Sequence, residues 1–423
     1  MLHLPDPRIY YCIQTVTGNP MTDCPPSAPG RYGLERTDQC VKCALCLPRC
    51  PTYRLTALET ESPRGRIRLM EALDRGEVGF DPAVVEALEH CLGCLSCEAV
   101  CPASVPYGAL IDRVRTVMPA KRGFSLEPWV IRLTTHPRLL LIFDRLLRTL
   151  ARTGLLTLLR RVLPGPGGRP LRLLPDPYPG HSVHAGRWAP SGPPTANRVA
   201  LLAGCFSSLW SPAIYDSAVR VLTRWGHPVE IPESPLCCGA LARHSGAETR
   251  AARQREEACA RLDPSTPLLV TDSGCWREAR ELADDVYELT SFLLRAWPQG
   301  VHAALGKSQR IAVHVPCSQS AQVHQPRAAE QLMENIDQVV LLPFELPEGC
   351  CGGAGSYLLA MPEWSSRFAS SLLPALPQPL PDRIVTTNLG CRMQFEAELR
   401  RAGLVIPVQH PVEVLDEAFG RLP

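Results

Sequence analysis

The chain has 423 residues, of which 45% are hydrophobic, and a formal net charge of +2. This length allows two or three domains with substantial cores, and the near-neutral charge gives no reason to expect nucleic-acid binding. The nineteen cysteines are the compositional outlier. An odd number of cysteines in tight clusters argues against a secreted disulfide scaffold, which normally has a much shorter chain.

The first residues carry no recognisable targeting signal. Residues 1–30 lack the continuous apolar run of a secretory peptide, so we expect a cytoplasmic protein whose thiols stay reduced. No stretch reaches the roughly 18 to 20 apolar residues of a membrane span. Residues 1–32 differ in character from the rest and are interpreted as an N-terminal extension, in which Met21 is an alternative start.

Residues 33–118 contain two copies of one cysteine pattern. They read CVKCALCLPRCP from Cys40 to Pro51 and CLGCLSCEAVCP from Cys91 to Pro102. Both follow C-x2-C-x2-C-x3-C-P, the bacterial run that binds [4Fe–4S] clusters. Three closely spaced thiolates wrap one cluster, and in two-cluster proteins the fourth cysteine of each run is a ligand of the other cluster.

This rule predicts two [4Fe–4S] clusters in residues 33–118. The predicted ligands are Cys40, Cys43, Cys46 and Cys101 for the first cluster, and Cys50, Cys91, Cys94 and Cys97 for the second. Zinc also binds C-x2-C pairs. However, a tetrahedral zinc site needs two such pairs rather than a repeated four-cysteine run that closes each time with Cys-Pro.

The segment between the two runs is predicted to be helical. Ser62 followed by Pro63 is typical of an N-cap and a first helical position, so a helix is expected to begin there. Arg64 and Arg66 then lie in its first turn, where positive charge opposes the helix dipole. Two explanations stay open: these arginines face the negative charge of a cluster or partner, or they are solvated.

Residues 119–196 contain no cysteine and are rich in arginine, leucine and proline. The segment 138–163 is predicted to form an amphipathic helix with arginines at helical spacing on one face. It either packs on a neighbouring domain with a solvated arginine face, or docks to an anionic membrane surface or an acidic partner subunit. Residues 164–180 are rich in proline and glycine and are predicted to be a linker without helix or strand.

In residues 197–423 predicted strands alternate with predicted helices, and the order repeats. The predicted strands are 198–205, 227–233, 267–273, 310–317, 339–344 and 383–388, and the predicted helices are 212–225, 248–261, 327–335 and 362–373. The alternation implies parallel sheets built from βαβ units. The repeated order implies a duplicated α/β domain with halves at residues 197–300 and 301–423.

Each half carries four cysteines at nearly matching gaps. They are Cys205, Cys237, Cys238 and Cys275 in the first half, and Cys317, Cys350, Cys351 and Cys391 in the second. They follow predicted strands, and open α/β sheets place ligands at the carboxyl ends of strands, so each set is a candidate for an additional metal or iron–sulfur centre. The alternative is buried structural thiols, and the spacing leaves open whether one set or both bind metal.

Glycines follow the adjacent cysteines of each half, and three further cysteines lie outside both cysteine patterns. Gly239 and Gly352 follow the adjacent cysteines and are expected to let the backbone turn tightly and approach a bulky ligand. Cys12, Cys24 and Cys259 match neither pattern and are expected to be bystanders.

Two ferredoxin-type runs followed by two Cys-Cys-Gly repeats resemble the iron–sulfur subunit of bacterial glycolate oxidase (glycolate dehydrogenase). The phrases CPTYRL (50–55), ESPRGRI (61–67), CCGGAGSY (350–357) and TTNLGC (386–391) support this branch. More widely, residues 33–420 resemble the iron–sulfur subunits of lactate-utilisation and anaerobic glycerol-3-phosphate dehydrogenases and heterodisulfide reductase. These proteins share the cysteine-rich CCG domain.

The resemblance implies a mixed α+β and α/β fold, with a mostly helical two-cluster ferredoxin domain followed by a duplicated α/β CCG domain. It also implies that the flavin and the 2-hydroxy acid bind to separate FAD-containing subunits, so no catalytic residue is expected here. The chain would pass electrons from the flavin toward a membrane quinone, as a cytoplasmic protein peripheral to the inner face of the membrane. No G-x-G-x-x-G fingerprint follows a predicted strand, in agreement with a separate flavin subunit.

The chain departs from the wider family at two positions. In the heterodisulfide-reductase form each CCG motif ends in C-x-x-C, whereas Glu278 and Gln394 occupy the corresponding positions here. This counts against a noncubane cluster and disulfide cleavage, and leaves the ligand of the CCG cysteines open. The alternatives are therefore the same role with lactate or glycerol 3-phosphate, a thiol–disulfide reductase, and a non-redox metal-binding protein.

Overall fold

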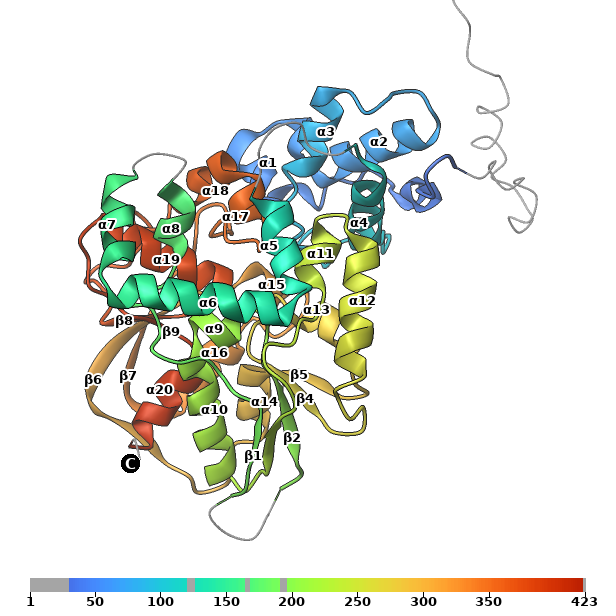
Figure 1. The fold of residues 1–423 in the computed structure, drawn as a ribbon. Helices are drawn as coiled ribbons and strands as arrows, with labels where there is room; N and C mark the ends of the chain where they lie inside the picture. The colour runs from blue at the N-terminus through green and yellow to red at the C-terminus, as the bar shows by residue number, and fades with distance from the viewer. Residues whose placement is uncertain (1–29, 120–125, 164–167, 191–195, 421–423) are drawn as a thin grey trace, which may run out of the picture.

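The computed structural model describes residues 30–119, 126–163, 168–190 and 196–420 (Figure 1). Cys12, Met21 and Cys24 lie outside these residues. Within them, no helix combines the length and apolar character needed to cross a bilayer. The predicted fold class is confirmed, because a helical N-terminal zone is followed by two parallel sheets with helices packed around them.

Residues 30–119 form helices joined by the loops that carry the first eight cysteines. The elements are η3 (Glu35–Gln39), η4 (Leu47–Arg49), α1 (Pro51–Thr56), η5 (Glu59–Glu61), α2 (Pro63–Asp74), α3 (Pro82–Glu89) and α4 (Tyr107–Val117). Helix α2 begins as predicted, since Ser62 Oγ accepts a hydrogen bond from Gly65 N at 2.9 Å and Pro63 lies in the first turn. The buried side chains of Leu73, Leu88 and Val114 join these helices in one core.

The strands of the second half of the chain form two sheets with the same topology. The strands are β1 (Gly186–Trp188), β2 (Val199–Leu202), β3 (Val229–Ile231), β4 (Leu268–Val270), β5 (Val286–Glu288), β6 (Ala303–Val313), β7 (Ile336–Leu342), β8 (Arg383–Val385) and β9 (Val408–Gln409). Their orders are β1-β3-β2-β4-β5 and β7-β6-β8-β9, and every pairing is parallel except β1 with β3. Without β1 the two orders are identical, which confirms the repeat.

Twelve helices of the described chain pack around these sheets. They are α9 (Ser207–Trp210), α10 (Pro212–Arg224), α11 (Ala240–His244), α12 (Glu248–Cys259), α13 (Trp276–Ala279), α14 (Leu289–Arg295), α15 (Cys317–Ala321), α16 (Ala328–Glu334), α17 (Tyr357–Ala360), α18 (Pro362–Ala369), α19 (Leu389–Arg401) and α20 (Pro411–Ala418). Helix α10 packs against α20, and α14 packs against α16. These two pairs are equivalent in the repeat, because α10 and α16 lie between the first two strands of their halves while α14 and α20 follow the last.

The halves share one core and also meet at the loops that carry the cysteines. Leu201 of β2, Ile311 of β6 and Val412 of α20 belong to the same buried apolar cluster. At the carboxyl ends of the strands, Asn388 Nδ2 donates a hydrogen bond to Asp272 Oδ1 at 3.1 Å. These two residues hold matching places in the repeated segments, VTDSGC and VTTNLGC, so equivalent loops face each other.

The zone between residues 119 and 196 differs from the sequence prediction. The single helix expected over 138–163 is wrong: α5 (Glu127–Thr134) is followed by α6 (Pro137–Arg152) and α7 (Leu155–Val162), which are separated at Gly154, where φ is +74°. The linker prediction for 164–180 is also wrong in part, since α8 (Arg169–Leu173) forms with a proline in its first turn. Strand β1 was not predicted; it extends the first sheet as an antiparallel edge strand.

Candidate metal centres

The four thiols predicted for the first cluster lie around one pocket at the surface. Cys40, Cys43, Cys46 and Cys101 all line it, and Cys97 contributes to the same wall. Cys43 is exposed, and the neighbouring Val41 and Leu45 are 69% and 56% exposed. We call Cys40, Cys43, Cys46 and Cys101 the first set.

The backbone of both ferredoxin-type runs has a conformation suited to an anionic ligand. Lys42 and Ala44 have φ of 57° and 71°, and Gly93 and Leu95, at the matching positions of the second run, have φ of 66° and 60°. Three of these four residues are not glycine, so the conformation is strained and must be maintained by the surrounding structure. Alternating right- and left-handed residues turn successive N–H groups toward one concavity, which fits an iron–sulfur cluster with its thiolates.

The four thiols predicted for the second cluster, Cys50, Cys91, Cys94 and Cys97, form the second set. Burial raises the pKa of the Cys97 thiol well above its usual value, and the neighbouring charges of Cys94, Cys91 and Cys50 raise it further. The charge of Cys46, from the first set, adds to these three, so the two sets lie side by side around Cys97. Thiols held this deep stay protonated without metal, so binding of a metal centre must release protons.

Hydrogen-bond donors point at the sulfurs of the second set. Arg66 is 1% exposed, and its Nη1 lies 3.9 Å from Cys50 Sγ, while its Nη2 donates to Glu61 Oε2 at 2.5 Å. Tyr107 donates its hydroxyl hydrogen to Cys91 Sγ at 3.4 Å. Of the two arginines left open by the sequence, Arg66 thus faces a sulfur of the second set, and Arg64, which is paired with Glu59, lines the pocket of the first set.

The third set comprises Cys205, Cys237, Cys238 and Cys275, past the carboxyl ends of β2, β3 and β4. A hydrogen bond with Cys205 raises the pKa of Cys237 more than any other contact does, and a hydrogen bond with Cys238 does the same for Cys275. Burial raises both values further. The charge of Cys205 also raises the pKa of Cys275, which joins the two pairs in one cluster, and Thr134 of α5 also contacts Cys237.

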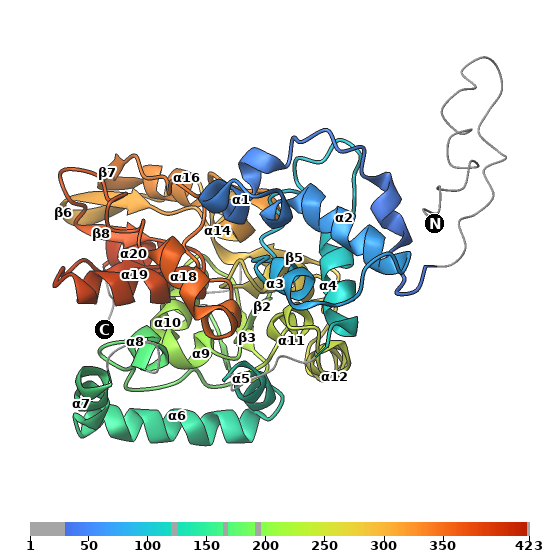
Figure 2. The same ribbon diagram turned by 90° about the horizontal axis from the view of Figure 1, so that it is seen from above.

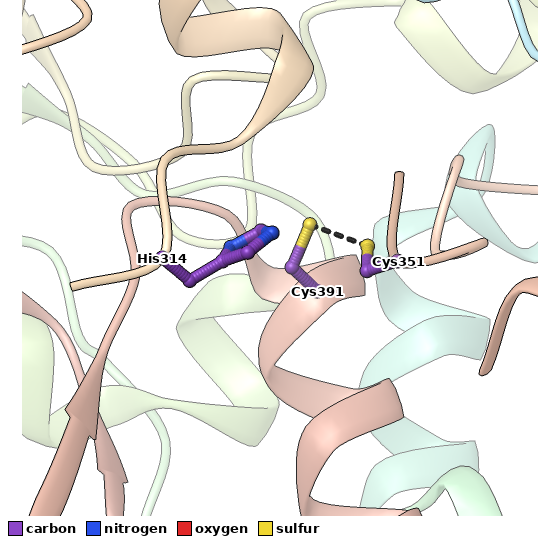
Figure 3. Close-up of side chains that lie close together, drawn as sticks. All are labelled: His314, Cys351 and Cys391. Atoms are coloured by element: carbon purple, nitrogen blue, oxygen red, sulfur yellow. Dashed lines mark hydrogen bonds between the residues drawn. The ribbon is translucent and has the colours of Figure 1, made fainter. Parts of the chain in front are cut away.

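The fourth set comprises Cys317, Cys350, Cys351 and Cys391, at the equivalent ends of β6, β7 and β8. Hydrogen bonds connect Cys317 with Cys350, Cys350 with Cys351, and Cys351 with Cys391. Cys351 Sγ and Cys391 Sγ are 2.7 Å apart (Figure 3). Because the cysteines of both sets come from three separate loops, only the sheet topology assembles them.

The turns after the adjacent cysteines need glycine for two reasons. Gly239 and Gly352 have φ of +91° and +76°, so a tight turn is present. A Cβ at Gly352 would lie 2.7 Å from Ser365 O of α18, and one at Gly239 would lie 3.0 Å from Ala251 O of α12. A side chain at either position would therefore crowd the backbone of the following helix, which glycine avoids.

The second and fourth sets touch each other, although their cysteines are far apart in the sequence. Cys94 and Cys317 form a hydrogen bond, which is the largest of the effects that raise the pKa of Cys94 well above its usual value. Cys94 also packs beside the buried Cys350 and Tyr357. Nothing in the spacing of the cysteines indicated this contact, which depends on how the helical zone docks on the second sheet.

The residues at the missing fifth-cysteine positions are both engaged with protein. Gln394 Nε2 donates to Cys351 O at 3.2 Å and to Ser365 Oγ at 2.9 Å. Glu278 is fully buried and lies 3.0 Å from Arg243 Nε. Gln394 therefore holds the neighbouring backbone, and Glu278 is paired with an arginine.

His314 was missed by the sequence reasoning. One of its ring nitrogens and the sulfurs of Cys351 and Cys391 all lie within 4.8 Å of one another, and the three residues are buried. Burial lowers the pKa of His314 to about 3, so the imidazole is neutral at pH 7. A signal existed, since the aligned segments RVALLAGC and RIAVHVPC place this histidine opposite Leu202.

Comparisons with known proteins agree with this arrangement. A family model described as a 4Fe-4S dicluster domain matches residues 36–105, and a cysteine-rich domain matches residues 199–277 and 311–396. The probable glycolate oxidase iron-sulfur subunit of Bacillus subtilis is 31% identical over 91% of this chain and 96% of its own length. The chain belongs to the family of glycolate oxidase iron–sulfur subunits.

Other members of this family and its neighbours bear out the assignment. The glycolate oxidase iron-sulfur subunit of Escherichia coli is 30% identical over 90% of this chain and 93% of its own length. Lactate utilization protein A of Shouchella clausii is 28% identical over 52% of this chain and 98% of its own length. Full-length similarity thus extends to the glycolate oxidase subunits, whereas this lactate-utilisation relative covers about half of the chain.

Proposed function

We propose that this protein is the electron-transfer subunit of a multi-subunit, flavin-dependent glycolate oxidase, relaying electrons from FAD-containing subunits toward a membrane quinone. The observation that carries the proposal is the proximity of the eight ferredoxin-type thiols to one another, with Cys94 in contact with Cys317 of the fourth set. Iron–sulfur clusters, when bound, supply one-electron oxidation and reduction. The relatives that match over nine tenths of the chain are described as glycolate oxidase subunits.

The chain's own residues would hold the clusters and adjust their environment. In this proposal the first and second sets each bind one [4Fe–4S] cluster, and the third and fourth sets bind additional centres. Tyr107 and Arg66 donate toward sulfurs of the second set, and such hydrogen bonds influence the reduction potential of a cluster. Neither position that would supply the fifth cysteine is a cysteine, so we do not propose disulfide reduction.

The rim of the first set is the proposed docking surface for the FAD-containing subunit. Val41 and Leu45 are exposed apolar side chains on the loop between Cys40 and Cys46. Exposed apolar side chains beside a functional site are typical of a protein interface. Cys50, Cys91 and Cys97 of the second set are buried whereas Cys43 is exposed, so the first set is the one that a partner can approach closely.

A second exposed surface supports association with a membrane. Helices α6 and α7 lie along one edge of the molecule (Figure 2). Their exposed apolar residues are Leu139, Ile142, Phe143, Leu146, Leu155, Leu158 and Val162, and the exposed Leu163 follows α7 directly. Arg138, Arg145, Arg152 and Arg161 are exposed on the same helices, and this mixture of apolar and basic side chains is typical of helices that lie on an anionic bilayer.

We expect the variant carrying both Ile142→Asp and Leu158→Asp to bind anionic vesicles at least about tenfold more weakly than the unmodified protein. Each apolar side chain contributes roughly 1.5–3 kcal/mol when it is buried, and the new carboxylates are repelled by the lipid headgroups. Co-sedimentation with phosphatidylglycerol vesicles measures the change. Val405→Asp is the matched control, because Val405 is 97% exposed but lies outside α6 and α7. If the variant bound vesicles unchanged but lost a partner subunit, the surface of α6 and α7 would be a protein interface instead of a membrane-binding surface.

Anaerobic purification of the complex tests the proposed function. We expect a flavoprotein to copurify and glycolate to reduce the clusters. Electron paramagnetic resonance (EPR) detects this reduction. If lactate or glycerol 3-phosphate reduced the clusters and glycolate did not, the proposed substrate would be wrong. If none of the three reduced them, the whole proposal would be overturned. Iron and sulfide analysis should give about eight irons if only the first two sets are filled, and more if the third or fourth set also holds iron.

A further inference from the structure

We infer that His314 is a ligand of the metal centre in the fourth set, which therefore has thiolate and imidazole ligands while the third set has thiolates alone. This inference rests on the proposed function only in that the fourth set binds a metal centre. It adds a residue outside both cysteine patterns to that site. It also makes the two halves of the repeat chemically different.

The position of the imidazole carries the inference. A ring nitrogen of His314 lies within 4.8 Å of both Cys351 Sγ and Cys391 Sγ, and all three side chains are at most 5% exposed. Ligand atoms around one tetrahedral metal ion are about 3.5–3.8 Å apart, so small side-chain shifts would complete the coordination. Figure 3 shows the ring of His314 directed at Cys391 from the strand side, opposite to Cys351.

A second contact fixes the ring in the orientation that a ligand needs. His314 Nδ1 and Thr386 Oγ1 are 3.0 Å apart, and Thr386 is 2% exposed. Histidines that bind metal almost always use their second ring nitrogen in such a hydrogen bond, which leaves Nε2 for the metal. Phe344 and Phe395 surround the ring, with centroids 6.3 and 5.0 Å away, so competing water is excluded.

The comparison of the two halves separates a ligand from a general feature of the fold. Leu202 occupies the place of His314 in the first half and is buried in an apolar cluster. The fold therefore does not require a polar residue at this position. In the fourth set the place of a fifth cysteine is taken by Gln394, whose amide is bound to Ser365 and Cys351 O. His314 then supplies the additional donor from the opposite side.

Histidine in place of a further cysteine changes the chemistry of the centre. A neutral imidazole brings no negative charge, whereas a thiolate brings one. In clusters where histidines replace cysteines the reduction potential is higher. The fourth set lies next to the second set through Cys317 and Cys94, so a centre of higher potential would favour electron movement out of the ferredoxin-type zone.

Isotope labelling of the whole complex tests the inference. The complex is labelled with ¹⁵N-histidine and purified anaerobically in three forms. They are the unmodified protein, His314→Leu, which copies the first half, and His314→Cys, which retains a ligand. Iron and zinc contents are measured, followed by pulsed EPR for a paramagnetic centre or zinc-edge X-ray absorption for zinc. His227→Leu is the control, because His227 is also a buried histidine but precedes the amino end of β3, opposite to the cysteine loops.

In the unmodified protein we expect pulsed EPR to show a strong coupling to a histidine nitrogen or, if the metal is zinc, X-ray absorption to show one nitrogen ligand. This signal should persist in His227→Leu. It should disappear in His314→Cys, which should keep its metal, while His314→Leu should lose most of the metal of the fourth set. A fourth-set centre with sulfur ligands only would overturn the inference and leave the proposed function intact. Absence of any metal beyond the first two sets would overturn both the inference and the part of the proposed function that places a centre there.

Discussion

Replacing Cys101 with alanine is expected to remove about four of the irons bound per chain and to abolish electron transfer from glycolate. The reason is that Cys101 lies at the pocket of Cys40, Cys43 and Cys46, although 55 to 61 positions of sequence separate it from them. Loss of one thiolate leaves the cluster of the first set without its closing ligand. Iron and sulfide analysis together with the EPR spectrum of the reduced protein measure the loss.

Paired variants test the crossed assignment directly. Cys101→Ala and Cys43→Ala should remove the same EPR signal, and Cys50→Ala and Cys94→Ala should remove the other. Cys259→Ala is the control, since Cys259 is exposed and belongs to none of the four sets. If Cys101→Ala instead removed the signal that Cys94→Ala removes, each run would hold its own cluster and the crossed assignment would be wrong.

Replacing Arg66 with methionine is expected to lower the local free energy of unfolding of α2 by about 3–5 kcal/mol, the usual cost of breaking a buried ion pair. The substitution leaves the buried carboxylate of Glu61 without its arginine and also removes the hydrogen bond from Arg66 Nε to Ala87 O at 2.6 Å. Hydrogen exchange of the α2 amides measures this local stability without assuming that the whole chain unfolds in one step.

Two further variants separate the ion pair from helix packing. Arg64→Met should leave exchange unchanged, because Arg64 and Glu59 form an exposed pair that solvent screens. The double variant of Arg66→Met with Glu61→Leu should recover part of the stability, since no unpaired charge remains buried. Equal exchange in Arg66→Met and Arg64→Met would show that the buried pair does not stabilise α2.

The Arg66→Met variant should also change the second set. Arg66 Nη1 is the guanidinium nitrogen closest to Cys50 Sγ, at 3.9 Å. Loss of this positive charge should lower the reduction potential of the cluster held there, because the reduced form carries more negative charge. Redox titration followed by EPR gives the potential.

Features encoded over short stretches could be predicted from the sequence. The two ferredoxin-type runs, the start of α2 at Ser62 and the repeated order of strands all depend on neighbouring residues or on regular alternation. The thiols of the third and fourth sets could be grouped because parallel strands bring their carboxyl ends to one edge. Edge strand β1 and helix α8 could not, since each is short and is stabilised by packing on a distant part of the chain.

Contacts between distant elements were decided only by the tertiary structure. Docking of the helical zone on the second sheet brings Cys94 to Cys317, and the path of β6 brings His314 to Cys391. The same packing buries Arg66 and leaves Arg64 exposed, although both lie in one helical turn. By itself the sequence determined which thiols are available and how each short run is shaped. Which sets touch, and which side chain completes them, followed from burial and topology because those contacts join different elements, 223 positions apart for Cys94 and Cys317 and 77 for His314 and Cys391.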